Sequence, residues 1–130
     1  MYCIDSNIAI DVFRGDKILA KKLDEAMNSN RPVCLTHITV CELFKGAFLH
    51  FNFEKKLEEV NEFVSSFDAI NLSLESSREF GRLYKKLKEA GRLIPEFDIM
   101  IAAIVKSKNL ILVTRDKKHF EDTGIKVEEW

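Results

Sequence analysis

The sequence of 130 residues has few cysteines and no long apolar run. Its three cysteines include no Cys-x-x-Cys pair, and Cys3 and Cys34 lie in short apolar segments, which favours buried, reduced thiols. No apolar run reaches membrane-spanning length, and the N-terminus has neither a basic leader nor a signal-type apolar core. We therefore expect a cytoplasmic protein without a membrane segment.

The sequence also lacks linkers, internal repeats and an excess of one charge. Its two prolines are isolated, and no Gly/Ser/Pro-rich stretch divides the chain, so we expect a single domain over residues 1–130. The composition, 46% hydrophobic and 32% charged, is typical of a globular protein and not of a disordered one. A formal charge of −1 argues against wholesale coating of nucleic acid, although it leaves local basic patches open.

Short apolar runs alternate with helical patterns along the whole chain. The runs predict strands at residues 2–4, 33–35, 69–72 and 110–113, and a last strand near 125–127. Between them, apolar spacing predicts helices, one opening at Thr39, one capped by Ser73 and one over residues 97–106. This alternation indicates the α/β class, with a three-layer α/β/α sandwich around a mainly parallel sheet of about five strands.

Four acidic residues stand beside the predicted strands in the same way. Asp5 and Asp116 follow the strands at 2–4 and 110–113, whereas Glu42 and Asp98 lie in the first turns of helices that follow or feed strands. In a parallel sheet with right-handed crossovers, all these positions share the carboxyl edge. Carboxylates gathered there repel one another unless a divalent cation binds, and oxygen ligands suit Mg²⁺ or Mn²⁺ in phosphate chemistry.

Each of these acids also has a purely structural explanation. Asp5 is a good helix cap, and Asp98 is an acid favoured by the helix dipole in a first turn. Residues 39–42 match a capping box, in which Glu42 would accept from the amide of Thr39. Asp116 is a common turn residue. The joint placement of all four at one edge favours the metal site.

Four segments resemble the PIN-domain family, most closely its VapC-type toxin ribonucleases of type II toxin–antitoxin systems. The segments are YCIDSN at 2–7, ITVCEL at 38–43, DIMIAA at 98–103 and LVTRD at 112–116. Their order and spacing extend over essentially the whole chain and imply a PIN-like fold. The resemblance also implies the site residues, namely the acidic quartet Asp5, Glu42, Asp98 and Asp116, the hydroxyl residue Ser6 and the accessory acid Glu96.

The resemblance implies a metal-dependent endoribonuclease that cleaves single-stranded or looped RNA and leaves 5′-phosphate and 3′-hydroxyl ends. Asp5 and Asp98 would be the central ligands of Mg²⁺ or Mn²⁺, Glu42 would ligate the metal or orient the attacking water, and Asp116 would complete the site. The implied partners are a VapB-type antitoxin lying over the site and a second copy of the chain in a homodimer. Phe48, Leu49 and Phe51 are candidate interface residues.

Cations near the acids are candidates for RNA binding. Arg115 and Lys117 flank Asp116, so we expect phosphate contacts there. The three histidines have no metal-ligand spacing. His119 is near Asp116 in sequence and is a candidate for an outer contact of the site, although an ordinary surface histidine is the simpler interpretation.

Three other functions are compatible with an acidic sheet edge. One is a PIN nuclease that processes or decays RNA without an antitoxin, and another is a catalytically silent nucleic-acid-binding domain. The presence of all four acids argues against the silent domain. The third is a phospho-acceptor signalling domain, which needs paired acids after its first strand. Here Asp5 is followed by Ser6 and Asn7, and no acid ends the third strand at Leu72.

Overall fold

A single parallel sheet organises the computed structural model, which describes residues 1–130. The strand order is β3-β2-β1-β4-β5, and every neighbouring pair is parallel. The strands are β1 (Tyr2–Ile4), β2 (Val33–Thr36), β3 (Asp68–Ile70), β4 (Ile111–Thr114) and β5 (Lys126–Glu129). The predicted α/β class and five-stranded sheet are confirmed, and the sheet is wholly parallel.

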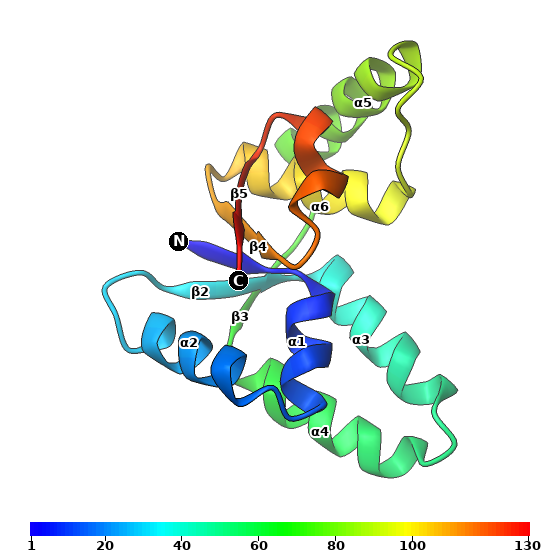
Figure 1. Cartoon of the computed structure of the whole chain (residues 1–130). Coiled ribbons are helices and arrows are strands. Elements are labelled where there is room, and N and C mark those ends of the chain that lie inside the picture. The colour runs from blue at the N-terminus through cyan, green and yellow to red at the C-terminus, as the bar shows by residue number, and fades with distance from the viewer.

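Helices cover both faces of this sheet and complete the expected three layers (Figure 1). One face carries α5 (Leu74–Glu89), α6 (Glu96–Ser107) and the 3₁₀ helix η1 (Lys117–Thr123). The other face carries α1 (Ser6–Phe13), α2 (Lys17–Met27) and α4 (Phe53–Ser65). The remaining helix, α3 (His37–Leu49), packs against α4 and α1.

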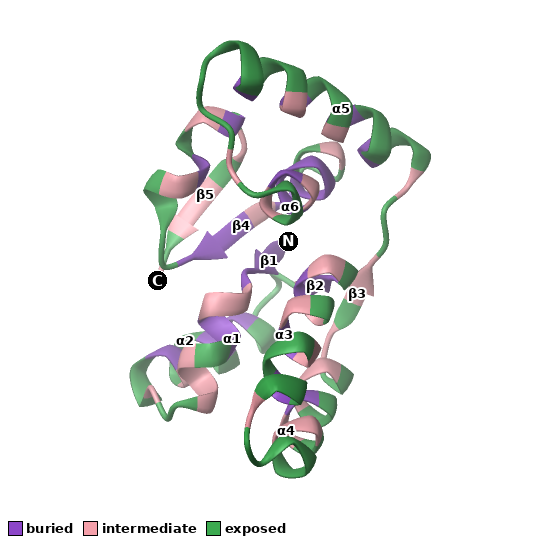
Figure 2. Ribbon diagram, turned by 90° about the vertical axis from the view of Figure 1, so that its right-hand side faces the viewer, coloured by how far each residue is buried: buried purple, intermediate pink, exposed green.

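The central strand β1 shows why the strands in the middle of the sheet are mostly apolar. Cys3 lies in the core under α5 and α6, whereas Tyr2 and Ile4 lie in the core under α1 and α2. Successive strand residues point to opposite faces, so a strand covered on both sides needs an apolar residue at every position. Figure 2 shows β1 and β4 buried between the helical layers. All three cysteines are free, and Cys3 and Cys34 are buried as predicted.

The start of α3 differs from the prediction. The helix begins at His37, because β2 runs on to Thr36 and the hydroxyl of Thr36 caps the helix by accepting from the amide of Thr39 at 3.0 Å. The predicted capping box at residues 39–42 is therefore wrong. Glu42 lies in the second turn of α3 and has no capping role, which leaves its carboxylate free for another purpose.

The other differences are short shifts of element ends. β3 ends at Ile70 instead of residue 72, and β4 extends to Thr114, which pairs with Glu129 of β5. The expected short turn after Asp116 is a 3₁₀ helix of seven residues that ends at Gly124, where φ is +72°. None of the helices has the length and apolar character needed to cross a membrane.

Candidate active site at the carboxyl edge of the sheet

Asp5 stands where β1 ends, and it is held by two hydrogen bonds. Its Oδ1 accepts from the amide of Ser6 at 2.8 Å, and its Oδ2 accepts from the hydroxyl of Thr114 at 2.8 Å. The residue is only 7% exposed. Burial raises the pKa of Asp5, the two hydrogen bonds oppose this, and the nearby charge of Asp98 adds to it. Asp5 therefore caps α1 and also presents an oriented, buried carboxyl group at the sheet edge.

Glu42 reaches the same edge from α3. Its Oε2 accepts from the hydroxyl of Ser6 at 3.4 Å, whereas its Oε1 is buried and has no hydrogen-bond partner. Burial, followed by the charges of Asp5 and Asp98, raises the pKa of Glu42 to about 7. A buried oxygen without a partner is costly, so this atom indicates a ligand that the protein itself does not supply.

Asp98 lies in the first turn of α6, as predicted, and is electrostatically coupled to Asp5 and Glu42. Its charge raises the pKa of both Asp5 and Glu42, so the three carboxylates share one electrostatic site. Its Oδ2 is 2.9 Å from Nε2 of His119. Glu96, the expected accessory acid, is the first residue of α6, two residues before Asp98, and its side chain is exposed.

Asp116 follows β4 at the rim of the site and is exposed. Its Oδ1 accepts from the amide of His119 at 3.2 Å and so caps η1, and its own amide donates to the hydroxyl of Thr114 at 3.2 Å. Asp116 therefore has the structural role in a turn that was expected, and it also lies at the carboxyl edge of the sheet, where the metal-site prediction places it. The bonds through His119 and Thr114 connect it to Asp98 and Asp5.

Thr114 and Asn7 are site residues that sequence reasoning missed. The hydroxyl of Thr114 is fully buried, donates to Asp5 and accepts from Nδ2 of Asn7 at 3.1 Å. Oδ1 of Asn7 in turn accepts from the amide of Arg115 at 3.3 Å. The only feature in the sequence that could have indicated Thr114 is its position as a hydroxyl residue at the end of the most apolar strand. Its partner Asp5 is 109 positions away, so local patterns could not reveal the bond.

Arg115, expected to bind RNA, is engaged with the protein itself. Its guanidinium nitrogens contact Oδ2 of Asp11 at 3.1 Å, Oδ2 of Asp16 at 2.6 Å and the carbonyl oxygen of Trp130 at 2.9 Å. These contacts fasten the end of β4 to α1, to the start of α2 and to the end of β5. Lys117 is exposed and has no ion pair, so it is the freer of the two predicted cations.

The donor set fits a hard divalent cation, although the side chains do not form a finished ligand shell. No three His, Cys, Asp or Glu side chains are placed to hold one ion, since the carboxylates of Asp5 and Asp98 face protein donors. The observation that fits a cation is the buried, unpaired Oε1 of Glu42 between like charges. Mg²⁺ or Mn²⁺ would satisfy this oxygen and neutralise the charges. The metal site itself stays a prediction.

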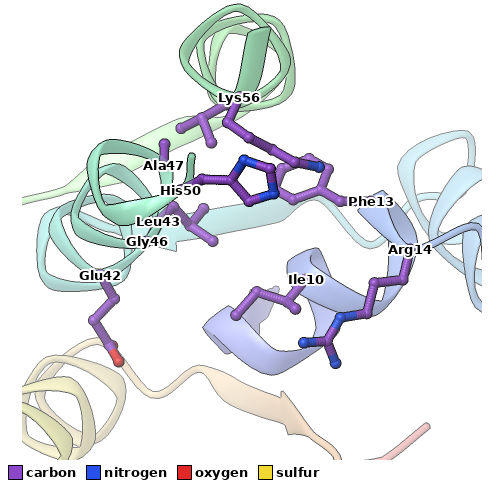
Figure 3. A pocket seen from close by; sticks show the side chains of 10 residues that line it. Ile10, Phe13, Arg14, Glu42, Leu43, Gly46, Ala47, His50 and Lys56 are labelled. Carbon is purple, nitrogen blue, oxygen red and sulfur yellow. The ribbon is translucent and has the colours of Figure 1, made fainter. Parts of the chain in front are cut away.

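A cavity of about 400 Å³ adjoins the site between α1, α3 and α4 (Figure 3). Glu42 lies at one end of it, and His50 and Lys56 lie towards the other. Apolar side chains line about half of the cavity, including Phe13, Leu43, Ala47 and Val60. The acidic site therefore continues into an apolar groove with basic residues at its rim.

An apolar ridge projects from the junction of α3 and α4. Phe48 is 62% exposed, Leu49 is 80% exposed and Phe51 is 94% exposed. These are the residues that the sequence suggested for an interface, and none of them is used by the core. Such contiguous exposed apolar residues are typical of a surface that binds another protein.

Comparison with known proteins agrees with the fold. A family model described as PIN domain matches residues 2–126. The chain is 30% identical to Ribonuclease VapC2 of Haemophilus influenzae, covering 99% of this chain and 97% of that protein. It is 29% identical to the tRNA(fMet)-specific endonuclease VapC of Shigella flexneri, with the same coverage. The solved structure of VapBC-1 from nontypeable Haemophilus influenzae matches with a TM-score of 0.89 and 25% identity, covering 99% of this chain and 97% of that one.

Proposed function

Because the chain belongs to the PIN domain family and is a relative of the VapC ribonucleases, we propose that it is a Mg²⁺-dependent endoribonuclease acting as the toxin of a VapBC-type pair. Mn²⁺ is an alternative cation. The observation that supports this most is the buried, unpaired Oε1 of Glu42 beside the charges of Asp5 and Asp98. The two buried free thiols support a cytoplasmic location.

Each acid has a distinct role in this proposal. When bound, the cation ionises a water and neutralises charge on the phosphoryl oxygens. Asp5 arrives already oriented by Ser6 and Thr114, which reduces the cost of ordering a ligand. Glu42 reaches the same edge from α3 with an unpaired carboxylate oxygen, which would ligate the cation or orient the attacking water. The 3′-oxygen leaves, which gives 5′-phosphate and 3′-hydroxyl ends.

Removal of divalent metal is the direct test of this function. We expect the purified protein to cleave structured RNA with Mg²⁺ and to lose all detectable cleavage in EDTA. Transfer RNA is the first substrate to try, because one relative is named a tRNA(fMet)-specific endonuclease. Mapping of the ends by ligation and sequencing should give 5′-phosphates, and added Mn²⁺ should restore activity. Cleavage that continues in EDTA, or that leaves 2′,3′-cyclic phosphates, contradicts the metal mechanism.

We further propose that the groove beside Glu42 binds a segment of the antitoxin. Apolar side chains line about half of the groove and Glu42 lies at one end of it, so a bound segment would reach Glu42 and could place a basic side chain there. The solved relatives are toxin–antitoxin complexes, which supports a partner of this kind. The exposed ridge at Phe48, Leu49 and Phe51 is the candidate surface for the second copy of the homodimer, and light scattering on the isolated chain checks its mass.

Filling the groove should weaken antitoxin binding without harming the fold. Gly46 lines the groove within α3, and a side chain there meets no atom within 4 Å of its Cβ. We expect Gly46→Leu to stabilise the helix slightly, to keep RNA cleavage and to weaken binding of the antitoxin encoded beside the gene by about tenfold or more. Isothermal titration measures this affinity.

Gly81 provides the matched control for this experiment. It lies within α5, far from the groove, and its Cβ also meets no atom within 4 Å. Gly81→Leu should leave antitoxin binding unchanged. Equal antitoxin affinity in both variants would place the partner elsewhere. If no small partner binds the wild-type chain at all, the alternative of a PIN nuclease without an antitoxin is favoured.

A further inference from the structure

We propose that His119 is a positioning residue that holds Asp98 in place for the divalent cation and thereby strengthens metal binding. This inference rests on the proposed metal-dependent function and deepens it. The sequence suggested His119 only as a candidate outer contact, with an ordinary surface histidine as the simpler interpretation. The structure places His119 between two of the acids, which come from separate elements.

His119 contacts both acids through different groups. The ring nitrogen Nε2 is 2.9 Å from Oδ2 of Asp98, and the backbone amide donates to Oδ1 of Asp116 at 3.2 Å. The side chain of His119 is 31% exposed and that of Asp98 is 20% exposed, so their contact is partly shielded from water. His119 therefore fixes a distance between α6 and the loop after β4.

The ring of His119 is itself anchored. It packs edge-on against the ring of Phe120, with the centroids 5.1 Å apart and the planes at 90°. Phe120 is only 1% exposed and belongs to the core under α5 and α6. A histidine beside such an anchor, on a helix capped by Asp116, differs from a freely rotating surface side chain.

The orientation of the Asp98 carboxylate depends more on this single contact than the orientation of the Asp5 carboxylate depends on either of its two hydrogen bonds. Two protein donors hold the carboxylate of Asp5, whereas His119 is the only hydrogen-bond partner of the carboxylate of Asp98. The bond uses Oδ2, so Oδ1 is left for a ligand. Without His119, the side chain of Asp98 would rotate freely and would have to be ordered when the ion binds.

Hydrogen bonds from outside the ligand set commonly orient metal-binding carboxylates, and their loss typically weakens metal affinity by about 10–100-fold. The expected function of His119 is of this kind. Its ring donates to one oxygen of Asp98, which restricts rotation of the carboxylate and leaves the other oxygen available to a cation. The effect should appear in metal affinity and less in the rate at saturating metal.

Two substitutions separate the donor nitrogen from the packing of the ring. His119→Phe keeps an aromatic ring against Phe120 and removes the donor, whereas His119→Gln keeps a nitrogen at a similar reach. Binding of Mn²⁺ to the metal-free protein is measured by isothermal titration or by electron paramagnetic resonance. We expect affinity about tenfold weaker in His119→Phe and within about threefold of wild type in His119→Gln. Glu121→Gln, on the same helix and exposed, should bind Mn²⁺ as wild type does.

Cleavage kinetics give a second readout. In His119→Phe, the Mn²⁺ concentration for half-maximal cleavage should rise, while kcat at saturating Mn²⁺ should approach that of wild type. Unchanged Mn²⁺ affinity in His119→Phe overturns the inference. The inference is also overturned if His119→Gln binds Mn²⁺ as weakly as His119→Phe. The donor nitrogen would then not be the group that strengthens metal binding. A wild-type chain that binds no Mn²⁺ overturns the metal site as well, whereas wild-type binding with unaffected variants overturns only the role of His119.

Discussion

Replacing Asp5 with Asn should abolish RNA cleavage and leave the fold intact. Asn keeps an oxygen that can accept from the amide of Ser6, so the cap of α1 is preserved. The change removes the charge that the cation needs most. We expect cleavage to fall on the order of 10³-fold or more, measured on the RNA that wild type cuts.

The same substitution should not lower the stability of the metal-free protein. Asp5 is buried beside the charge of Asp98, and its own charge raises the pKa of Glu42, so its removal relieves repulsion. The melting temperature of Asp5→Asn in EDTA should therefore equal or exceed that of wild type. Asp24→Asn, an exposed change on α2, serves as the control and should keep both activity and stability. Near-normal cleavage by Asp5→Asn would remove Asp5 from the metal site.

Replacing Glu42 with Gln should change stability and activity in opposite directions. The pKa of Glu42 is raised to about 7 from 4.5, so the folded metal-free protein prefers the protonated carboxyl group. This preference stabilises the fold fully below about pH 4.5, and the contribution is lost as the pH rises through 7. Each pKa unit corresponds to about 1.4 kcal/mol, so a shift from 4.5 to about 7 corresponds to about 3.5 kcal/mol. Glu42 is only partly buried, and solvent screening reduces the loss to on the order of 2 kcal/mol.

The side chain of Gln does not ionise as the pH rises, so Glu42→Gln should be more stable than wild type in EDTA at pH 8. The gain should vanish near pH 4.5, and cleavage should be severely reduced at every pH because the carboxylate proposed to bind the cation or orient the water is gone. Urea unfolding at the two pH values measures the difference. Added Mg²⁺ should stabilise wild type at pH 8 and leave the variant nearly unchanged. Glu75→Gln, exposed in the first turn of α5, is the control. Equal stabilities at pH 8 would mean that Glu42 is not crowded by like charges.

The sequence was sufficient to predict the sheet and the edge at which the acids lie. Short apolar runs located every strand to within two residues. The signal is strongest for β1, β2 and β4, because strands covered on both faces are mostly apolar. The placement of Asp5 and Asp116 followed directly from where β1 and β4 end. The first turn of α6 at Asp98 followed from the helical spacing alone.

The details that decide what each side chain does could not be predicted. Thr36 and Thr39 are both good caps by type, and only the length of β2 decides between them. Arg115 is a plausible phosphate ligand beside Asp116, yet its partners lie about a hundred positions away at Asp11 and Asp16. Bonds of this kind depend on the assembled fold, so they leave no pattern in a local stretch of residues.

The pairing of β1 with β4 has a consequence for the time at which the protein gains its activity. Residues 2–4 are synthesised first, yet they pair with residues 111–113, and the carboxyl group of Asp5 is held by Thr114. An unfinished chain on the ribosome has no β4, and long-range parallel pairing of this type is slow to form. We therefore expect the acidic edge to form only after residues 111–114 have been synthesised, so a chain terminated before β4 should lack it.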